Sequence, residues 1–220
     1  MIYIKLFLTL SILFIICGCS NRNKNVNSNT DQTVFAQEKA TVDSIAQNET
    51  NQVVFVTSKS DKIKIKDDAI FLNEKEKYRF QYDEIKYQSK RNKLLEVNGS
   101  VFLFIEVNGN PNLDRIYAFK IYKNRVDSLA DAISSELIDL DKDGNLEFGG
   151  RDLTESYPSK DSMYYIPSDY FEIKNGTIVY DSAYTKSADI GLNGIYLANP
   201  ADKEGNCCIV IKKPKKKTGR

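Results

Sequence analysis

The sequence contains no histidine, so the chemistry that this residue supplies in other proteins is missing. Its absence excludes the commonest general base, the histidine-based catalytic triads and nearly all catalytic zinc sites. The chain also lacks a G-x-S-x-G motif, an S-x-x-K motif and a P-loop. These absences favour a protein that is not an enzyme, although hydrolysis of glycosides by paired carboxylates needs none of these features.

Charge is nearly balanced over the chain but unevenly placed. The sequence has 31 basic and 30 acidic residues, and six of the basic residues lie in the last nine positions, which hold no acid. Without those six residues and Lys5, the body has 24 basic and 30 acidic residues, a net charge of −6. Because nucleic-acid affinity depends on neutralising phosphates, we expect no nucleic-acid partner. The basic tail at 214–220 is either a solvated end or a contact for an anionic lipid or polymer.

Only one long apolar run is present. Leu6–Ile16 is a run of 11 residues that follows the short segment Met1–Lys5 with its single positive charge. Such a run is too short to cross a hydrocarbon layer of about 30 Å, which needs roughly 20 residues, but it is typical of a signal peptide. We therefore expect residues 1–18 to be a signal peptide, with no later segment crossing a membrane.

The residues after this run carry a resemblance to a known class of protein. The order Ile16-Cys17-Gly18-Cys19 resembles the lipobox of bacterial lipoproteins, in which a small residue precedes the cysteine that is lipidated. The resemblance implies acyl chains such as palmitate on Cys19, and an export route into the cell envelope. Two or more chains are needed for stable anchoring. The alternative is an ordinary secretory signal that is cut nearby.

A polar segment separates the lipobox from the first strand-like run. Residues 19–52 are rich in asparagine and poor in apolar residues, so we expect a lipidated N-terminus followed by a disordered tether. In enteric bacteria, a serine after the lipidated cysteine goes with sorting to the outer membrane. Ser20 thus favours an outer-membrane location.

The body at 53–213 is predicted to be all-β or strongly β-dominated, with antiparallel hairpins in a meander. Asn-Gly pairs accept positive φ at both turn positions, as a type I′ hairpin requires. Two such pairs join strand-like runs: Asn98-Gly99 between 94–97 and 100–105, and Asn175-Gly176 between 171–174 and 177–180. Further strands are expected at 53–57, 62–66, 115–122, 136–138, 146–148, 195–197 and 208–212. The one helical candidate is Arg125–Ile133.

The residues best suited to chemistry lie in one acidic stretch. Residues 138–148 read Ile-Asp-Leu-Asp-Lys-Asp-Gly-Asn-Leu-Glu-Phe, with carboxylates at positions 1, 3, 5 and 9 counted from Asp139. Calcium takes 6–8 oxygen ligands at about 2.3–2.6 Å, and a tight loop of alternating carboxylates offers several of them. An EF-hand would place a bidentate carboxylate at position 12, where this chain has Gly150.

The pattern instead resembles the nine-residue D-x-D-x-D-G-x-x-D/E calcium loops of FG-GAP and VCBS-type repeats. That resemblance implies Asp139, Asp141, Asp143 and Glu147 as side-chain ligands of calcium and Asn145 as a backbone ligand. The alternative is an exposed acidic turn that holds no ion.

A second stretch, 33 residues earlier, aligns with the first and indicates an internal repeat. It places Glu106, Asn108, Asn110 and Asp114 where the first stretch has its four carboxylates. Two carboxylates have become amides and Pro111 replaces the glycine, so we expect weak binding or none. Two copies cannot close a propeller of about 4–8 blades, so a complete propeller is not expected.

Two other groups of residues are weaker candidates. Cys207 and Cys208 precede an apolar run, and we expect them to pack and to form no bridge with each other, because neighbours in a strand point to opposite faces. Tyrosines crowd the region after the acidic loop, at Tyr157, Tyr164, Tyr165 and Tyr170. They form either a glycan-stacking platform or part of the core.

Together these features predict a lipid-anchored envelope protein whose β domain is stapled by calcium and has a binding or structural role, with an unknown protein or glycan partner. One alternative is an envelope hydrolase that acts on polysaccharide or cell wall through Asp and Glu chemistry. Another is a glycan-binding module.

Overall fold

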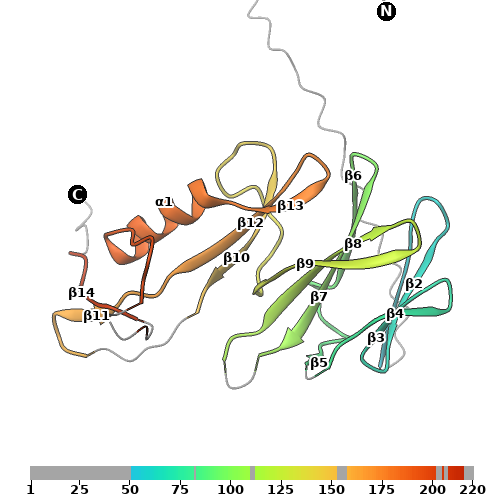
Figure 1. Cartoon of the computed structure of the whole chain (residues 1–220), viewed down its shortest axis with the longest axis horizontal. Coiled ribbons are helices and arrows are strands. Elements are labelled where there is room, and N and C mark those ends of the chain that lie inside the picture. Colours follow the sequence, from blue (N-terminus) through green and yellow to red (C-terminus); the bar gives the residue numbers. More distant parts are fainter. Residues whose placement is uncertain are drawn as a thin grey trace, which may run out of the picture. The chain divides into compact units, whose positions relative to one another are not determined.

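The computed structural model describes residues 51–81, 83–109, 112–152, 158–201, 205 and 208–215. Its strands form three sheets and one small ladder, and every pairing is antiparallel (Figure 1). Within these residues, no helix is long and apolar enough to cross a membrane. The expectation of a strand-dominated fold is confirmed, and no sheet of the described residues closes into a propeller.

The sheets follow one another along the chain. The N-terminal sheet contains β1 (Gln52–Val56), β2 (Lys62–Lys66), β3 (Ala69–Leu72) and β4 (Lys75–Arg79). The central sheet contains β5 (Glu84–Ile85), β6 (Lys93–Val97), β7 (Ser100–Asn108), β8 (Arg115–Tyr122) and β9 (Arg125–Ile133). The C-terminal sheet contains β10 (Leu146–Arg151), β12 (Ser168–Lys174) and β13 (Thr177–Tyr180). The small ladder pairs β11 (Ser162–Tyr164) with β14 (Val210–Lys212), and the helix α1 spans Ser182–Asn193.

The central sheet is covered on both faces. Strand β7 contains six consecutive buried residues, Phe102–Val107, as expected of a strand with no solvent-exposed face. Leu103, Ile105 and Val107 pack in one hydrophobic cluster with residues of the N-terminal sheet. Phe102 and Phe104 pack in a second cluster with residues of the C-terminal sheet. The alternation of side chains along β7 therefore assigns successive residues to two different cores.

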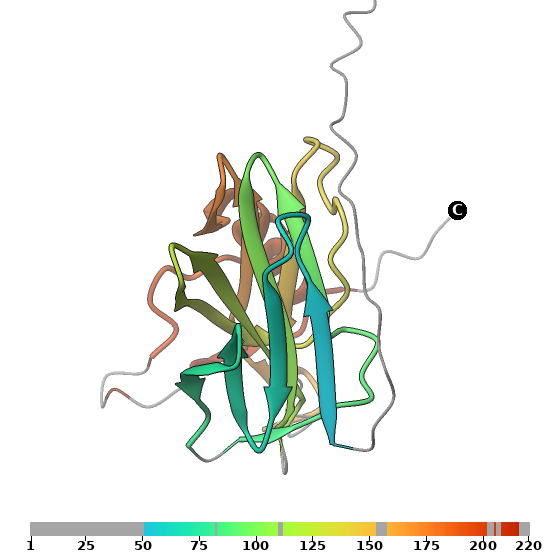
Figure 2. The same cartoon turned by 90° about the vertical axis from the view of Figure 1, so that its right-hand side faces the viewer.

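Aromatic rings connect the central sheet to each of the two outer sheets. Phe104 on β7 meets Phe148 on β10 edge to face, with ring centroids 5.3 Å apart. On the other face, Tyr78 on β4 meets Phe119 on β8 in the same geometry at 4.8 Å. Such pairs contribute about 0.5–1.5 kcal/mol beyond the area that they bury. These contacts help to hold the outer sheets to the central one (Figure 2).

Five hairpins have two-residue loops in which both loop residues have positive φ. The two predicted Asn-Gly turns are among them, closing Val97 on Ser100 and Lys174 on Thr177. The other three loops contain no glycine: Asp67-Asp68, Asn73-Glu74 and Lys123-Asn124. Their sequences gave no strong turn signal, which is why β3, β4 and β9 were not predicted as strands.

The segment Arg125–Ile133 is strand β9 and not the predicted helix. Its buried residues alternate at Ala130 and Ala132, and it pairs with β8 along its whole length. Two further expected strands are also absent: 136–138 forms only a single bridge, from Ile138 to Glu147, and 195–197 forms no strand. The last predicted strand is shorter than expected, since β14 covers only Val210–Lys212.

Helix α1 was not predicted, because its buried face is polar. The buried residues Thr185, Asp189 and Asn193 recur every four positions. Thr185 accepts a hydrogen bond from Tyr170 N–H at 3.2 Å. Asp189 accepts one from Ser168 N–H at 2.9 Å. Asn193 donates one to the Ile166 carbonyl, just before β12, at 3.1 Å.

This spacing has a geometric reason. Four helical residues rise about 6 Å and two strand residues about 6.6–6.8 Å, so the two periods nearly match. Strand β13 pairs with β12 only over Phe171–Lys174, and α1 covers the edge beyond that point. A helix here blocks an edge that would otherwise be open to another strand.

Cys208 lies outside strand β14 and is disulfide-bonded, with a partner outside the described residues. The expectation that Cys207 and Cys208 form no bridge with each other stays a prediction. The strand expected at Cys208 is not formed, because this residue lies in irregular backbone before β14. Cys207 and Cys19 lie outside the described residues.

The two Asn-Gly turns permit a matched test of this hairpin geometry. An added Cβ at Gly99 would meet nothing within 4 Å, so Gly99→Ala should cost only the penalty for left-handed backbone, about 1–2 kcal/mol. At Gly176 the added Cβ would lie 2.9 Å from Ser100 Oγ, which donates a hydrogen bond to the Gly176 carbonyl. Gly176→Ala should therefore be more destabilising by about 0.5–1.5 kcal/mol. Urea unfolding of both variants checks this, and equal losses would contradict it.

Candidate metal centre

The predicted calcium loop connects two of the sheets. It begins after β9 of the central sheet and ends in β10 of the C-terminal sheet. Ile138 and Glu147 close its base through two backbone hydrogen bonds of 2.9 and 3.1 Å. The loop is therefore the covalent crossover between the two sheets, and its conformation helps to fix how β10 enters its own sheet.

The backbone within the loop turns towards the carboxylates. The N–H of Asp143 donates to Asp139 Oδ1 at 3.1 Å, and the N–H of Gly144 donates to Asp139 Oδ2 at 3.1 Å. Lys142 and Gly144 both have positive φ, of 66° and 95°. The glycine in the motif is thus needed for its backbone conformation, since a Cβ there would meet no neighbouring atom.

The four predicted carboxylates converge. One oxygen from each of Asp139, Asp141, Asp143 and Glu147 lies within 4.8 Å of the others. This is the one such group of potential metal ligands among the residues that the structure describes. Like charges at this separation repel one another, so the arrangement carries an electrostatic cost that a divalent cation would offset.

Glu147 differs from the other three ligands because it is fully buried, with 0% of its surface exposed. Its Oε2 accepts a hydrogen bond of 2.6 Å from the backbone N–H of Leu140. Its Oε1 is buried and has no hydrogen-bond partner among the described residues. Burial raises the pKa of Glu147, and the charges of Asp141, Asp143 and Asp139 raise it further. A buried acceptor without a donor, on a side chain whose carboxylate lies among three others, fits a cation ligand.

Asn145 was predicted to contribute its backbone carbonyl. Its side chain has another role, because Nδ2 donates to Asp143 Oδ2 at 2.9 Å and to Glu172 Oε2 at 3.1 Å. Asn145 therefore connects the loop to strand β12. The donor set is of carboxylate oxygens, which suit calcium and magnesium.

Two residues beside the loop were missed by sequence reasoning. Glu172 on β12 lies directly across from Glu147 on β10 and is largely buried. Lys174 Nζ donates to both carboxylate oxygens of Glu172 at 3.0 Å and lies 3.9 Å from Asp143 Oδ2. Glu172 and Lys174 are 25 and 27 residues from Glu147, and only the strand register brings them to the loop.

The second, degenerate stretch has a different environment. Glu106 accepts hydrogen bonds from Arg91 Nη1 at 2.8 Å, from Ser134 Oγ at 2.6 Å and from Ser89 Oγ. Asp114 forms an ion pair of 2.5 Å with Lys86.

The carboxylates of this stretch therefore face protein cations and hydroxyl groups, and they do not face one another. Asn108 donates to Glu84 at 3.1 Å, while Asn110 lies outside the described residues.

The tyrosines after the acidic loop do not share one exposed face. Tyr165 is completely buried, and its hydroxyl donates to Asp189 at 2.5 Å and accepts from Leu197 N–H at 3.1 Å. Tyr170 packs edge to face on Tyr184 at 4.8 Å. Tyr157 lies outside the described residues. A stacking platform that needs Tyr165 is therefore not formed.

Glu106 provides a test of how far its paired charge stabilises the fold. Burial by itself raises the pKa of Glu106, but the hydrogen bonds from Ser134, Ser89 and Arg91 outweigh burial and lower it. Glu106→Gln should therefore reduce the free energy of unfolding at pH 7 by about 2–3 kcal/mol. Because the pKa is lower in the folded state, this stability is present above the unfolded-state pKa and lost as the pH falls through the folded-state value.

Urea unfolding of the wild type and of Glu106→Gln between pH 7 and pH 2 measures the effect. The difference between the two proteins should close on acidification. Glu136→Gln is the matched control, because Glu136 pairs with Arg91 and Lys93 while half exposed and should cost under about 1 kcal/mol. A difference that does not change with pH would contradict the assignment.

Comparison of the chain with known protein families, with curated proteins and with solved structures finds no match. The function argued below therefore rests on the residues and geometry of this chain.

Proposed function

We propose that this protein is a lipid-anchored component of the bacterial cell envelope whose β domain is stapled by calcium, and that its role is structural or binding and not catalytic. The observation that carries the calcium assignment is the buried carboxylate of Glu147, which lies within 4.8 Å of those of Asp139, Asp141 and Asp143 and has one oxygen, Oε1, without a hydrogen-bond partner among the described residues. The loop follows the nine-residue pattern of the FG-GAP and VCBS-type calcium loops in all four of its carboxylates.

Calcium is preferred to magnesium in this proposal. Magnesium demands near-ideal octahedral geometry at about 2.0–2.1 Å and keeps several waters, whereas calcium accepts 6–8 oxygens at variable angles. The loop offers three carboxylates from an exposed turn, together with one buried carboxylate on strand β10. Affinity in the range of extracellular modules, about 10⁻⁴–10⁻³ M, is expected of such a site.

The position of the loop supports a stapling role. An ion held by Asp139, Asp141 and Asp143 from the turn and by Glu147 from β10 would join the crossover to the edge of the C-terminal sheet. It would also relieve the repulsion among these carboxylates and satisfy the buried oxygen of Glu147. Binding only to the folded state at 100 times the dissociation constant would stabilise it by about 2.7 kcal/mol.

The calcium assignment is tested by the melting temperature. Calcium should raise that of the wild type, with magnesium at the same concentration raising it less. Asp141→Ala and Asp143→Ala should abolish the rise, while Asp127→Ala, which removes a half-exposed carboxylate bonded to Arg125, should retain it. A wild type whose melting temperature calcium leaves unchanged would reduce the loop to a solvated acidic turn.

Glu147→Gln sharpens this test, because it separates loss of the site from loss of the fold. In chelator the variant should melt at or above the wild-type temperature, since a buried charge without a counter-charge has been removed. The variant should then gain nothing from calcium. A variant that melts lower in chelator and still responds to calcium would show that Glu147 is not a ligand.

The location is proposed from the lipobox-like residues, which lie outside the described part of the chain. Cys19→Ala should release the protein from membranes or leave it unprocessed, because the acyl chains would have no attachment point. Detergent-phase partitioning of the wild type and the variant measures this. Cys208→Ala is the control that removes a cysteine of the folded body. Equal partitioning of Cys19→Ala and the wild type would refute the anchor.

A further inference from the structure

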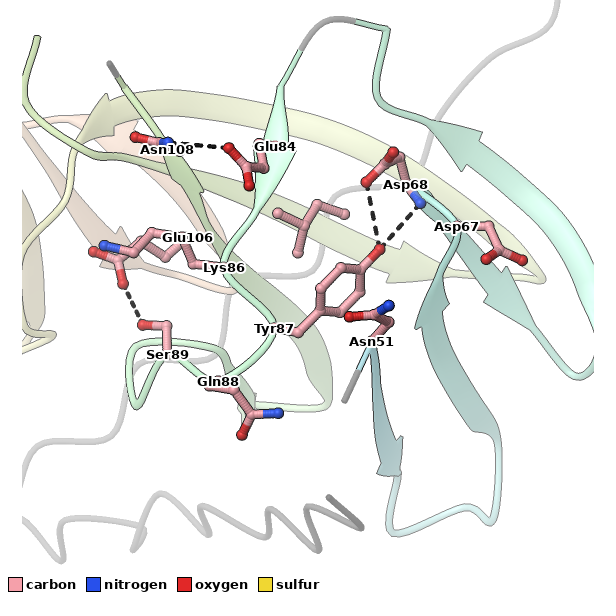
Figure 3. Close-up of a pocket in the computed structure, with 11 residues that line it drawn as sticks. Asn51, Asp67, Asp68, Glu84, Lys86, Tyr87, Gln88, Ser89, Glu106 and Asn108 are labelled. Atoms are coloured by element: carbon pink, nitrogen blue, oxygen red, sulfur yellow. Dashed lines mark hydrogen bonds between the residues drawn. The ribbon is translucent and has the colours of Figure 1, made fainter. Parts of the chain in front are cut away.

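A polar pocket of about 890 Å³ lies at the edge of the described domain, away from the acidic loop (Figure 3). Its volume is in the range of pockets for small organic ligands, about 300–1,000 Å³. Four parts of the chain line it: Asn51, the hairpin turn Asp67-Asp68, the segment 84–89 that begins in β5, and the end of β7 at Glu106 and Asn108. The residues of the wall come from segments up to 57 positions apart, so the fold alone assembles it.

The free charge in this pocket is negative. Asp67, Asp68, Glu84 and Glu106 line it, and Lys86 is its single lining cation. Lys86 is already neutralised by Asp114 at 2.5 Å, as Glu106 is by Arg91 at 2.8 Å.

The three remaining carboxylates are offset only weakly among the described residues. Glu84 accepts from the amide of Asn108 at 3.1 Å. Asp68 accepts from the hydroxyl of Tyr87, and Asp67 pairs with the exposed Lys66 at 3.5 Å.

Arg79 lies beside the turn and attracts both Asp67 and Asp68. Its guanidinium is, however, bonded to Glu76 by two hydrogen bonds of 3.0 and 2.6 Å. The pocket therefore keeps an excess of negative charge.

The lining also excludes several classes of ligand. Anions such as phosphate are repelled by the three carboxylates. A purely apolar ligand would leave the carboxylates of the wall without partners, although Ile85 and the ring of Tyr87 offer an apolar surface. A small metal ion is not favoured, since the carboxylates here do not converge as those of the acidic loop do. What fits is an organic cation that carries several N–H donors.

The walls of the pocket are held in place before any ligand binds. Asp68 N–H donates to the Tyr87 hydroxyl at 3.1 Å, which fixes the ring against the turn (Figure 3). Arg79 Nη1 donates to the Asp67 carbonyl at 2.9 Å, and Phe80 N–H donates to the Asp68 carbonyl at 2.9 Å. Preorganised walls reduce the entropy cost of binding.

The turn itself is unusual in composition. Asp67 and Asp68 have φ of 49° and 54°, a left-handed geometry in which Asn-Gly is preferred. Both positions of this turn at the edge of the pocket therefore hold aspartate, although Asn and Gly would be the more stable choice there.

We infer that this pocket binds an alkylammonium group, supplied either by a free polyamine or by a lysine side chain of a partner peptide. The ammonium would lie between Asp68 and Glu84, with its alkyl chain against Tyr87. Nearby aromatic rings add attraction for a cation. This inference is independent of calcium binding, because the pocket shares no residue with the acidic loop.

Spermidine and a trilysine peptide are the probes, titrated into the full-length protein with saturating calcium and followed by calorimetry and by amide chemical shifts. Asp68→Asn and Glu84→Gln should each weaken binding about three- to fivefold, and the double variant about tenfold or more. Asp68→Asn keeps the turn, since Asn is favoured at positive φ. Asp127→Asn is the matched control, because it removes the same charge from strand β9, and it should leave affinity within about twofold.

The outcomes separate the possibilities. Tighter binding of trilysine than of spermidine assigns the site to a peptide partner, and the reverse assigns it to a polyamine. Asp143→Ala should bind both probes as the wild type does, so failure of the calcium site and failure of the pocket are distinguishable.

No binding of either probe at about 10 mM would overturn the inference. Equal losses in Asp68→Asn, Glu84→Gln and Asp127→Asn would overturn it as well, because they indicate diffuse attraction to an acidic surface. Binding of maltotriose with shifts at Asp68 and Tyr87, without binding of the amines, would assign the pocket to neutral sugars instead.

Discussion

The burial of both faces of strand β7 is the constraint on which the rest of the domain depends. Each of its residues from Phe102 to Val107 must find a partner in one of two cores, so the central sheet needs a cover on either side. The N-terminal sheet provides one cover and the C-terminal sheet the other. A single apolar run in the sequence therefore requires two further sheets, and a slip of one residue in the register of β7 would exchange its two sets of side chains.

Glu106 interrupts this apolar run, and its surroundings show how a buried charge is accommodated. Its side chain points to the same side as Phe102 and Phe104, where Arg91, Ser89 and Ser134 each supply a hydrogen bond. Its backbone is held as well, since Asn92 Oδ1 accepts from Glu106 N–H at 2.8 Å. Breaking such a pair is costly, whereas replacing the whole pair by apolar residues of similar volume is often neutral for stability. The charge is thus better understood as fixing the arrangement of the segment 86–92, of which Lys86–Ser89 also line the polar pocket.

The acidic loop and the stretch at 106–114 show that similar patterns acquire different roles from their surroundings. Both have alternating polar oxygens after a strand, yet only the loop at 139–147 gathers its carboxylates around a common point. At 106–114 the first position lies inside a strand and the last pairs with Lys86, so neighbouring elements neutralise both carboxylates. In the acidic loop Lys174 lies 3.9 Å from Asp143, and it is bonded more closely to Glu172, at 3.0 Å. The balance of charge around the two stretches, and not their spacing, separates a candidate metal site from a structural ion pair.

Features that depend on a few adjacent residues were readable from the sequence: the all-β class, the two Asn-Gly hairpins, and the convergence of Asp139, Asp141, Asp143 and Glu147. Their geometry follows from local backbone preferences and from the reach of a nine-residue loop. Only the tertiary structure decided the features that depend on register and burial. Strand pairing set Glu172 opposite Glu147, and it turned Arg125–Ile133 into a strand despite its helix-like composition. It also buried the polar face of α1 against a strand edge, a pattern that hydrophobic periodicity cannot reveal because the buried residues are Thr185, Asp189 and Asn193.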